Sequence, residues 1–273
     1  MRVVHRISLE IDDVGRGILL QHGIIPSRMG SSLLRESLVW FVIDEDHRGW
    51  SEISAYLSGR AYGDFVETRF STAELAAAEY VNVVPAWHCG YPMADHDGGY
   101  LKLTFDQSRA CMTCGVGLRQ VAPFRMKREP KWGNRHILQL NWVFDEYFVL
   151  PDVWESVFKP FGVGRRPVLD HRREKPLSTV VQLDIQGRAM SKIDFKDDDF
   201  EVCESCGYRK HHAHRRGMFP FVETDRKDHM VKTQEYFGSG GSAWQAILIS
   251  AELYREIKRK KLKGVTFYPM AEA

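Results

Sequence analysis

The sequence predicts an α+β protein that is mostly antiparallel sheet with a few flanking helices. Short apolar or alternating runs recur along the chain, and charged or turn-forming residues bound each of them, as expected for strands. Few segments carry both a helix-start and a helix-stop signal. Four of the five cysteines lie in two Cys-x-x-Cys-Gly motifs. We therefore also expect a zinc-ribbon-like four-cysteine site formed by two distant knuckles.

The chain is long enough, at 273 residues, for one large domain or two ordinary ones. A stretch rich in His, Gly, Pro and Asp, residues 87–99, marks the expected boundary. We expect an N-terminal α+β part of unknown role over residues 1–90 and a zinc-ribbon-containing α+β part over residues 91–273. The alternative is that both parts pack as a single domain.

The N-terminal part is expected to contain strands and one helix. Its expected strands are residues 3–11, 37–43 and 65–70. The second of these is a continuous apolar run, which is typical of a buried strand. Ser71 followed by Glu74 forms a capping box, in which each side chain binds the other residue's backbone N–H. This box predicts a helix over residues 74–80 that ends before Pro85.

The zinc-bearing part shows strand patterns before each knuckle and near the C-terminus. Its expected strands are residues 100–105, 177–185, 199–202, 244–249 and 265–268. One helix is expected to run past Val153 and Phe158 and to end at Gly162, and another begins at Ser250 and ends before Gly264. The Asp145-Glu146 pair is interpreted as a helix-start signal, and acid/base chemistry is the alternative.

The two knuckles are Cys111-Met112-Thr113-Cys114-Gly115 and Cys203-Glu204-Ser205-Cys206-Gly207. In each, a tight turn aims two thiolates at one point, and the trailing glycine accepts a positive φ. Two knuckles supply a closed tetrahedral site of the structural type, with one Zn²⁺ held by Cys111, Cys114, Cys203 and Cys206. Compact ribbons separate their knuckles by about 15–20 residues. Here 89 positions separate Cys114 from Cys203, which requires a long insertion.

Other cysteine chemistries remain as alternatives. A thioredoxin-like dithiol normally occurs once, at a helix N-terminus, whereas this motif occurs twice after strand-like residues. Disulfide bonds would require export. The adjacent His88 and Cys89 are disfavoured as base and nucleophile, because neighbouring residues rarely point at each other. Whether Cys89 or a nearby histidine joins the metal site stays open.

The two halves of the zinc-bearing part look alike. Each contains a knuckle, then a connecting stretch, then a strand, a helix, a glycine and a strand, with Gly162 and Gly264 in corresponding places. We interpret this order as an internal duplication. A pseudo-two-fold axis would bring the two knuckles together despite their separation.

Composition and motifs narrow the classes of function. A net charge of +2 gives no global attraction to nucleic acid or to a membrane. No apolar run approaches the length of about 18 residues that a membrane span needs. The N-terminal residues lack the apolar core of a secretory signal, so we expect a reducing cytoplasmic location. Phosphate-loop, dinucleotide-binding and metalloprotease motifs are missing, so we expect no enzymatic activity.

One basic run, residues 208–216, follows the second knuckle and contains His211, His212 and His214. We interpret it as a solvated loop whose histidines are spectators, since four thiolates already saturate a tetrahedral zinc ion. The alternative is a phosphate-contacting arm, which would make the chain a nucleic-acid-binding zinc-ribbon protein.

Both knuckles, together with the strand–Ser–helix–Gly–strand–Pro ending over residues 247–269, resemble the bacterial double-CXXCG-motif proteins. The resemblance covers about residues 111–269. Some members of that family are described as immunity proteins that neutralise a toxin delivered by neighbouring cells. The resemblance implies a cytoplasmic, non-enzymatic binding protein whose protein partner is a toxin. It also implies that Cys111, Cys114, Cys203 and Cys206 hold the zinc ion.

Overall fold

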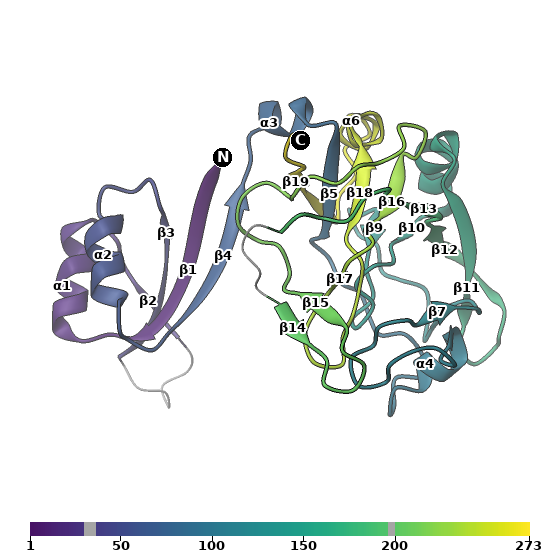
Figure 1. Ribbon diagram of the computed structural model, residues 1–273, viewed down its shortest axis with the longest axis horizontal. Coiled ribbons are helices and arrows are strands. Elements are labelled where there is room, and N and C mark those ends of the chain that lie inside the picture. The colour runs from purple at the N-terminus through teal and green to yellow at the C-terminus, as the bar shows by residue number, and fades with distance from the viewer. Residues whose placement is uncertain (30–36, 196–199) are drawn as a thin grey trace. The chain divides into compact units, whose positions relative to one another are not determined.

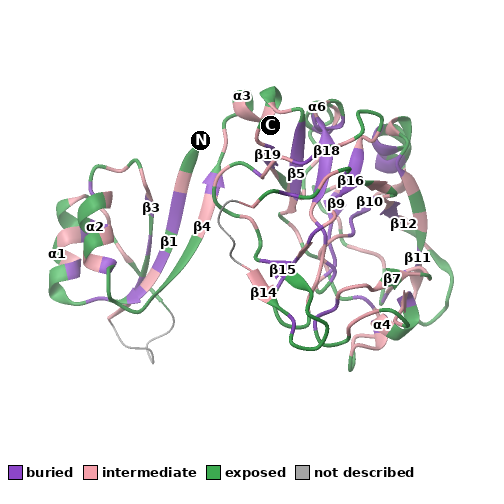
Figure 2. Cartoon of the chain, in the orientation of Figure 1, coloured by how far each residue is buried: buried purple, intermediate pink, exposed green. Residues whose placement is uncertain are grey.

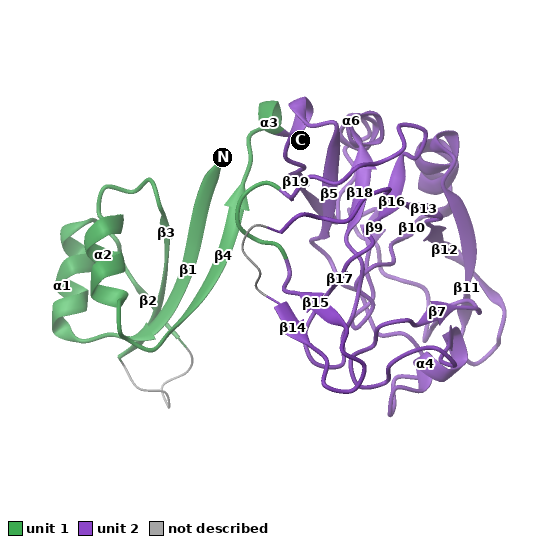
Figure 3. Ribbon diagram, in the orientation of Figure 1, with its two compact units in different colours: residues 1–74, 214–218 green, residues 75–213, 219–273 purple. Residues whose placement is uncertain are grey.

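The computed structural model describes residues 1–29, 37–195 and 200–273 (Figure 1). The chain divides into two compact units, which Figure 3 colours separately. The first unit contains residues 1–74 and 214–218, and the second contains residues 75–213 and 219–273. The division falls after Glu74, earlier in the chain than the boundary expected at residues 87–99. The reason is that the strand β5 (Tyr80–Pro85) belongs to a sheet of the second unit.

The first unit combines one sheet with two helices. Its elements in chain order are β1 (Arg2–Glu10), α1 (Asp13–Gln21), β2 (Ser27–Arg28), β3 (Leu38–Asp44), α2 (Trp50–Leu57) and β4 (Tyr62–Arg69). The strand order is β2-β3-β1-β4, and β1 is antiparallel to both β3 and β4. The predicted strands in this part of the chain are therefore confirmed.

The helices α1 and α2 share a core with one face of this sheet. Leu19 and Ile53 from the helices pack with Phe41 of β3 in a buried apolar cluster. On the opposite face of β3, Trp40 and Val42 are 37% and 45% exposed. The expectation of a fully buried strand here was wrong, because the run of apolar residues in β3 serves two faces and only one of them is covered by α1 and α2.

The capping box at Ser71 forms as predicted. The Glu74 carboxylate accepts the backbone N–H of Ser71 at 2.7 Å, and the Ser71 hydroxyl accepts the backbone N–H of Glu74 at 3.2 Å. The helix α3 (Thr72–Ala77) is shorter than expected. It stops at Ala77, and Tyr80 begins β5 instead of ending the helix.

The second unit consists mostly of short strands. Its elements before the second knuckle are β5 (Tyr80–Pro85), α4 (Gly99–Thr104), β6 (Phe105–Asp106), β7 (Arg119–Gln120), β8 (Arg125–Met126), β9 (Ile137–Leu138), β10 (Phe148–Val149), α5 (Pro151–Val153), the π-helical turn η1 (Trp154–Phe158), the 3₁₀ turn η2 (Lys159–Phe161), β11 (Gly164–Asp170), β12 (Pro176–Asp184), β13 (Gly187–Arg188) and β14 (Phe200–Val202). After it come β15 (Arg209–His211), β16 (Met230–Lys232), β17 (Tyr236–Phe237), β18 (Ile247–Ser250), α6 (Ala251–Arg259) and β19 (Val265–Pro269).

Most of the described strand pairs are antiparallel. The pairs β8–β11, β13–β16 and β15–β17 are the parallel ones. Together with the small number of helices, this arrangement confirms the predicted α+β class with mostly antiparallel sheet. Residues 100–105 were predicted as a strand, and this was wrong. They form α4 and the first residue of β6. A short apolar run is compatible with the periodicity of a strand or of a helix. Here Tyr100 and Thr104, which are four positions apart, are both buried, as expected for one face of a helix.

The two five-stranded sheets of the second unit repeat one arrangement. Their orders are β8-β11-β12-β10-β9 and β13-β16-β18-β5-β19. In the first, β12 lies between β10 and β11; in the second, β5 lies between β18 and β19, and these contacts are all antiparallel. In each sheet the two outer strands of this trio are consecutive in the chain and are joined by a helical segment.

The residue pairing of the two trios corresponds closely, which supports the internal duplication. In the first sheet Val181 pairs with both Val149 and Pro167. In the second sheet Val81 pairs with both Ile249 and Pro269. In the first sheet the central strand, β12, comes after the two outer strands in the chain. In the second sheet the central strand, β5, comes before them.

One apolar core joins the two trios. It contains Trp154 and Phe158 from η1, Leu253 and Ile257 from α6, and apolar residues of both sheets. Figure 2 shows β5, β16 and β18 as buried strands inside this unit. The Ser250 hydroxyl accepts the backbone N–H of Leu253 at 3.3 Å and so caps α6 as predicted. Among the described residues, no helix has the length and apolar character needed to cross a membrane.

Candidate metal centre

The two knuckles fold in the same way. In the first, the Gly115 N–H donates to the Cys111 carbonyl at 2.8 Å; in the second, the Gly207 N–H donates to the Cys203 carbonyl at 2.8 Å. Gly115 and Gly207 have φ angles of 79° and 71°, the left-handed region that glycine adopts without a steric penalty. The first knuckle lies between β6 and β7, and the second lies between β14 and β15. Each knuckle is therefore closed by a hydrogen bond within its own five residues.

The four cysteine sulfurs form one cluster. All four Sγ atoms of Cys111, Cys114, Cys203 and Cys206 lie within 4.8 Å of one another. Matching positions of the two knuckles face each other: Cys111 and Cys203 are 3.8 Å apart between sulfurs, and Cys114 and Cys206 are 3.7 Å apart. A tetrahedron with metal–sulfur distances of about 2.3 Å has edges of about 3.8 Å. The cluster therefore fits a metal ion with four thiolate ligands.

A pseudo-two-fold relation extends beyond the sulfurs. The hydroxyl oxygens of Thr113 and Ser205, which occupy the same position in the two motifs, are 2.9 Å apart. None of the cysteines forms a disulfide. The sulfur distances across the knuckles also greatly exceed the length of an S–S bond, about 2.05 Å. The arrangement joins two separate chain segments through one four-sulfur cluster.

The environments of the thiols differ. The backbone N–H of Cys114 points at the Cys111 sulfur and lowers the pKa of that thiol to about 6. Burial raises the pKa of the Cys114 thiol to about 12. Cys114 and Cys203 are buried, Cys111 is partly buried and Cys206 is exposed. Four thiolates this close repel one another, and a bound cation would neutralise them. Thiolate ligands favour zinc, copper(I) or iron over calcium and magnesium.

A buried lysine supports the cluster from β15. The Lys210 side chain is completely buried, and its Nζ donates to the carbonyl oxygens of Ser242 at 3.1 Å and Cys114 at 3.4 Å, and to that of Gly240. The Glu201 carboxylate lies 3.6 Å from the same nitrogen. Lys210 thus connects the strand after the second knuckle with the backbone of the first knuckle.

The basic run at residues 208–216 is not one solvated loop. Lys210 is buried, and the Arg209 guanidinium lies 3.9 Å over the ring of Phe200. His211 is 8% exposed and stacks on Phe195. The run also crosses from the second unit into the first after residue 213. The prediction of a solvated loop was wrong at Lys210 and His211, because β15 pairs with β14 and β17.

The remaining sulfur and histidine candidates lie elsewhere. Within the described residues, the metal-binding cluster contains four cysteines and no histidine, so Cys89, His88 and His211 are not members. The backbone N–H of Cys89 donates to the Gln139 carbonyl at 2.9 Å, and its side chain packs against an apolar cluster. Cys89 is therefore a partly buried thiol away from the metal centre.

Sequence reasoning missed a polar cluster that contains Asp145 and Glu146. These residues do not start a helix, which begins at Pro151. The Lys232 ammonium donates to Glu146 at 2.6 Å and to Asp145 at 3.2 Å. Burial opposes the charge of Lys232, but the two carboxylates outweigh it and raise its pKa. The only signal in the sequence was the position of two acidic residues inside an apolar run, and nothing near them pointed to Lys232, 86 positions away from Glu146.

Comparisons of the chain with protein-family models, with curated proteins and with solved structures gave no match.

Proposed function

We propose that this protein is a zinc-stabilised, non-enzymatic binding protein of the cytoplasm, and that its partner is a bacterial toxin that it neutralises. The observation that carries the proposal is the four-cysteine cluster, in which each knuckle contributes two sulfurs at tetrahedral distances. Zinc is the metal we infer, because a tetrahedral set of four thiolates is its usual structural site.

Four protein ligands leave no open coordination position, so the proposed zinc ion acts as a structural staple. Catalytic zinc sites keep one position for water or substrate. Here the staple joins chain segments 92 positions apart, and the free energy of metal binding adds to that of folding. Zinc in this role stabilises a binding surface and takes no part in chemistry.

The immunity role rests on the resemblance of residues 111–269 to the double-CXXCG-motif proteins. An immunity protein acts by occupying the surface of its toxin, so it needs complementarity in shape and charge and no catalytic residues. Nucleic-acid binding is the alternative, but Lys210 of the basic run is completely buried and is not available to phosphates. A dithiol oxidoreductase would use two cysteines of one motif, whereas here the four sulfurs of both motifs lie within 4.8 Å of one another.

Elemental analysis tests the metal. Protein purified without added metal should contain about one zinc ion per chain, and Cys203→Ser should lose it together with several kcal/mol of folding free energy. Cys89→Ser is the matched control, because Cys89 lies outside the cluster. Retention of zinc by Cys203→Ser, or its loss from Cys89→Ser, would contradict the proposed ligand set.

Co-expression tests the partner. The chain is expressed with each neighbouring open reading frame, cell survival is scored, and the tagged chain is then captured. A toxic neighbour should be neutralised stoichiometrically and should co-purify, with an interface of about 1,200–2,000 Å². Absence of any toxic neighbour, or turnover of a substrate by the purified chain, would end the immunity proposal. The metal analysis would be unaffected by that outcome.

A further inference from the structure

The second unit contains a polar cleft of about 560 Å³ beside the first knuckle. Gly115 of that knuckle and Ser242 are among its lining residues, together with residues of α4, β7 and both five-stranded sheets. Such a volume is typical of sites that hold a small molecule or a few side chains of a partner. The cleft lies where the two halves of the duplication meet, since Arg166 on β11 and Lys232 on β16 both reach it.

The charged residues of the cleft are arranged so that hydrogen-bond donors remain available. Its lining includes four cations and three carboxylates, namely Arg119, Arg166, Arg188, Lys232, Asp145, Glu146 and Asp184. Each of the carboxylates already accepts from a cation of the same lining: Asp145 and Glu146 accept from Lys232, and Asp184 accepts from Arg166. The acidic groups therefore position these cations. Arg119 is paired with Asp106, so among the described residues Arg188 is the cation of the lining without a carboxylate partner.

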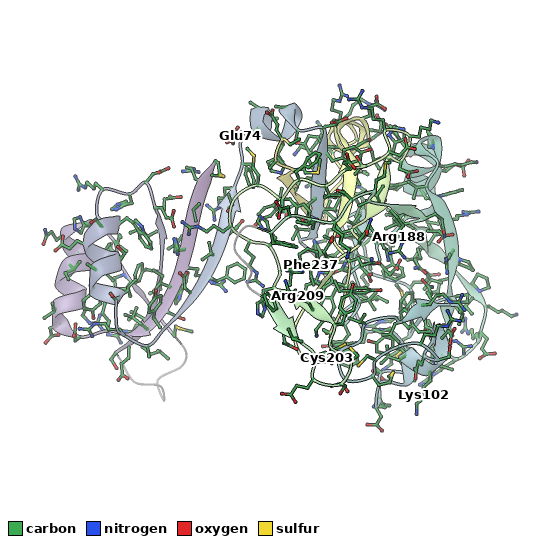
Figure 4. All side chains as sticks on the ribbon, viewed as in Figure 1. Glu74, Lys102, Arg188, Cys203, Arg209 and Phe237 are labelled. Atoms are coloured by element: carbon green, nitrogen blue, oxygen red, sulfur yellow. The ribbon has the colours of Figure 1, made fainter. Side chains whose placement is uncertain are left out.

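Two guanidinium groups are held in place by a single contact each. The Arg166 Nε donates to Asp184 at 2.9 Å, and the Arg188 Nη1 donates to the buried Gln245 at 2.6 Å. Arg166 makes no hydrogen bond through its two Nη atoms, and Arg188 makes none through Nε and Nη2, to any residue that the structure describes. Figure 4 labels Arg188 within the second unit, on the strand that pairs with β16. Fixed guanidinium groups with spare N–H donors are suited to oxyanions.

A polar network that includes Gln120, Glu146 and Lys232 of the lining adjoins the cleft. Gln182 donates to Glu146 at 2.8 Å, and Gln182 and Gln120 exchange hydrogen bonds at 2.6 and 2.9 Å. Lys232, with three N–H donors and two carboxylate partners among the described residues, retains one donor. Replacing such a buried ion pair by apolar residues is often neutral or stabilising, so stability alone gives no reason to keep it.

Trp142 gives a second, independent observation at the same place. It lines the cleft, is 48% exposed and has a φ of 67°, a backbone conformation that is unusual for a bulky residue. Strained residues of this kind cluster at ligand sites, where the surrounding structure holds them in position. The indole also provides an optical probe for the occupancy of the cleft.

We propose that this cleft is a binding site for a small oxyanion, either a phosphate group or a carboxylate, held by Arg166, Arg188 and the remaining donor of Lys232. The site takes either a free anionic metabolite or an acidic side chain of a partner protein. The proposal goes beyond the zinc-stabilised binding function and does not depend on it.

The test titrates the full-length, metal-loaded chain with three probes: inorganic pyrophosphate, citrate and the peptide acetyl-Asp-Glu-Asp-Glu-amide. Binding is followed by calorimetry and by tryptophan fluorescence. Pyrophosphate binding identifies a phosphate site, citrate binding a free carboxylate, and binding of the peptide alone an acidic segment of a protein. No response to any probe at about 10 mM would reject the proposal.

Variants locate the binding. Arg188→Gln and Arg166→Gln should each lower the affinity for the bound probe about tenfold, because hydrogen bonds between charged partners are stronger than those between neutral groups. Arg226→Gln is the matched control, since Arg226 is 88% exposed, pairs with Glu79 and lies outside the cleft. Trp142→Phe should abolish the fluorescence response, because Trp142 lines the cleft. Equal weakening in the control would overturn the assignment.

A measurement on the unmodified chain covers the case in which an arginine variant fails to fold. Hydrogen–deuterium exchange with and without the bound probe should show protection at residues 142–146 and 184–188. Protection confined to other segments would place the anion elsewhere and overturn the proposal.

Discussion

Replacing Lys210 with Met tests the assignment of this lysine as a buried support of the metal centre. The substitution keeps an unbranched aliphatic side chain and removes the ammonium group. In the native protein that group donates to the carbonyl oxygens of Cys114, Gly240 and Ser242, and it lies 3.6 Å from the Glu201 carboxylate. The substitution therefore leaves buried carbonyl groups of the first knuckle and its neighbouring loop without their donor.

The magnitude follows from these contacts. A buried carbonyl left without its donor costs about 1–3 kcal/mol, and three carbonyl oxygens lose the same donor here, so we take a total of about 3–5 kcal/mol. Glu201 contributes little to this loss, because its side chain is 38% exposed and water can replace the lysine. We expect the free energy of unfolding of the second unit to fall by about 3–5 kcal/mol, which lowers its melting temperature by about 6–20 °C.

The assay is urea unfolding followed by circular dichroism, with zinc present throughout. Lys102→Met is the matched control, since Lys102 is an exposed lysine of α4 that Figure 4 labels. The control should change stability by less than about 0.5 kcal/mol. A loss of less than about 1 kcal/mol in Lys210→Met would refute the reasoning, because an ordinary surface lysine behaves in that way.

Two further predictions concern the glycines of the two knuckles and Asp106, which lies on β6 ahead of the first knuckle. Gly115→Ala should cost several kcal/mol and reduce bound zinc, because a Cβ at φ +79° would lie 2.7 Å from a backbone oxygen. Gly207→Ala meets no atom within 4 Å, so its positive φ alone should cost about 1 kcal/mol; equal losses in urea unfolding would contradict this. The Ser108 backbone N–H, and then Arg119, lower the pKa of Asp106 from 3.8 to about 2. Because the folded pKa lies below the unfolded one, the stabilisation is complete above about pH 4 and is lost as the pH falls toward 2. Carboxyl NMR titration should show this midpoint, and Arg119→Gln should raise it; a wild-type midpoint near 4 would be the contrary result.

Local signals in the sequence were reliable where the structure satisfies them within a few residues. The capping box of Ser71 and Glu74 and the cap at Ser250 both form, because a side chain and a backbone N–H three positions apart meet in any helix start. Each Cys-x-x-Cys-Gly turn also closes on itself. The candidate ligands Cys111, Cys114, Cys203 and Cys206 could therefore be named without a structure.

Short apolar runs were less informative. Residues 100–105 fit a strand or a helix equally well, and the choice of helix came with the packing of Tyr100 and Thr104 on one buried side. The stretch up to Tyr80 has good helix formers, yet Tyr80 begins β5. Pairing of β5 with β18 and β19 provides hydrogen bonds and burial that outweigh the helix propensity of the preceding residues.

The sequence by itself determined the α+β class, the two knuckles and the order of strand, helix and strand in each half. Only the tertiary structure decided that β5 supplies the central strand of the second sheet, that Lys210 lies under the cysteine cluster, and that Lys232 pairs with Glu146. Each of these partners lies far away along the chain, 86 positions in the last case. Local propensity and periodicity act over a few residues, so a contact of this range leaves no pattern in the sequence around either partner.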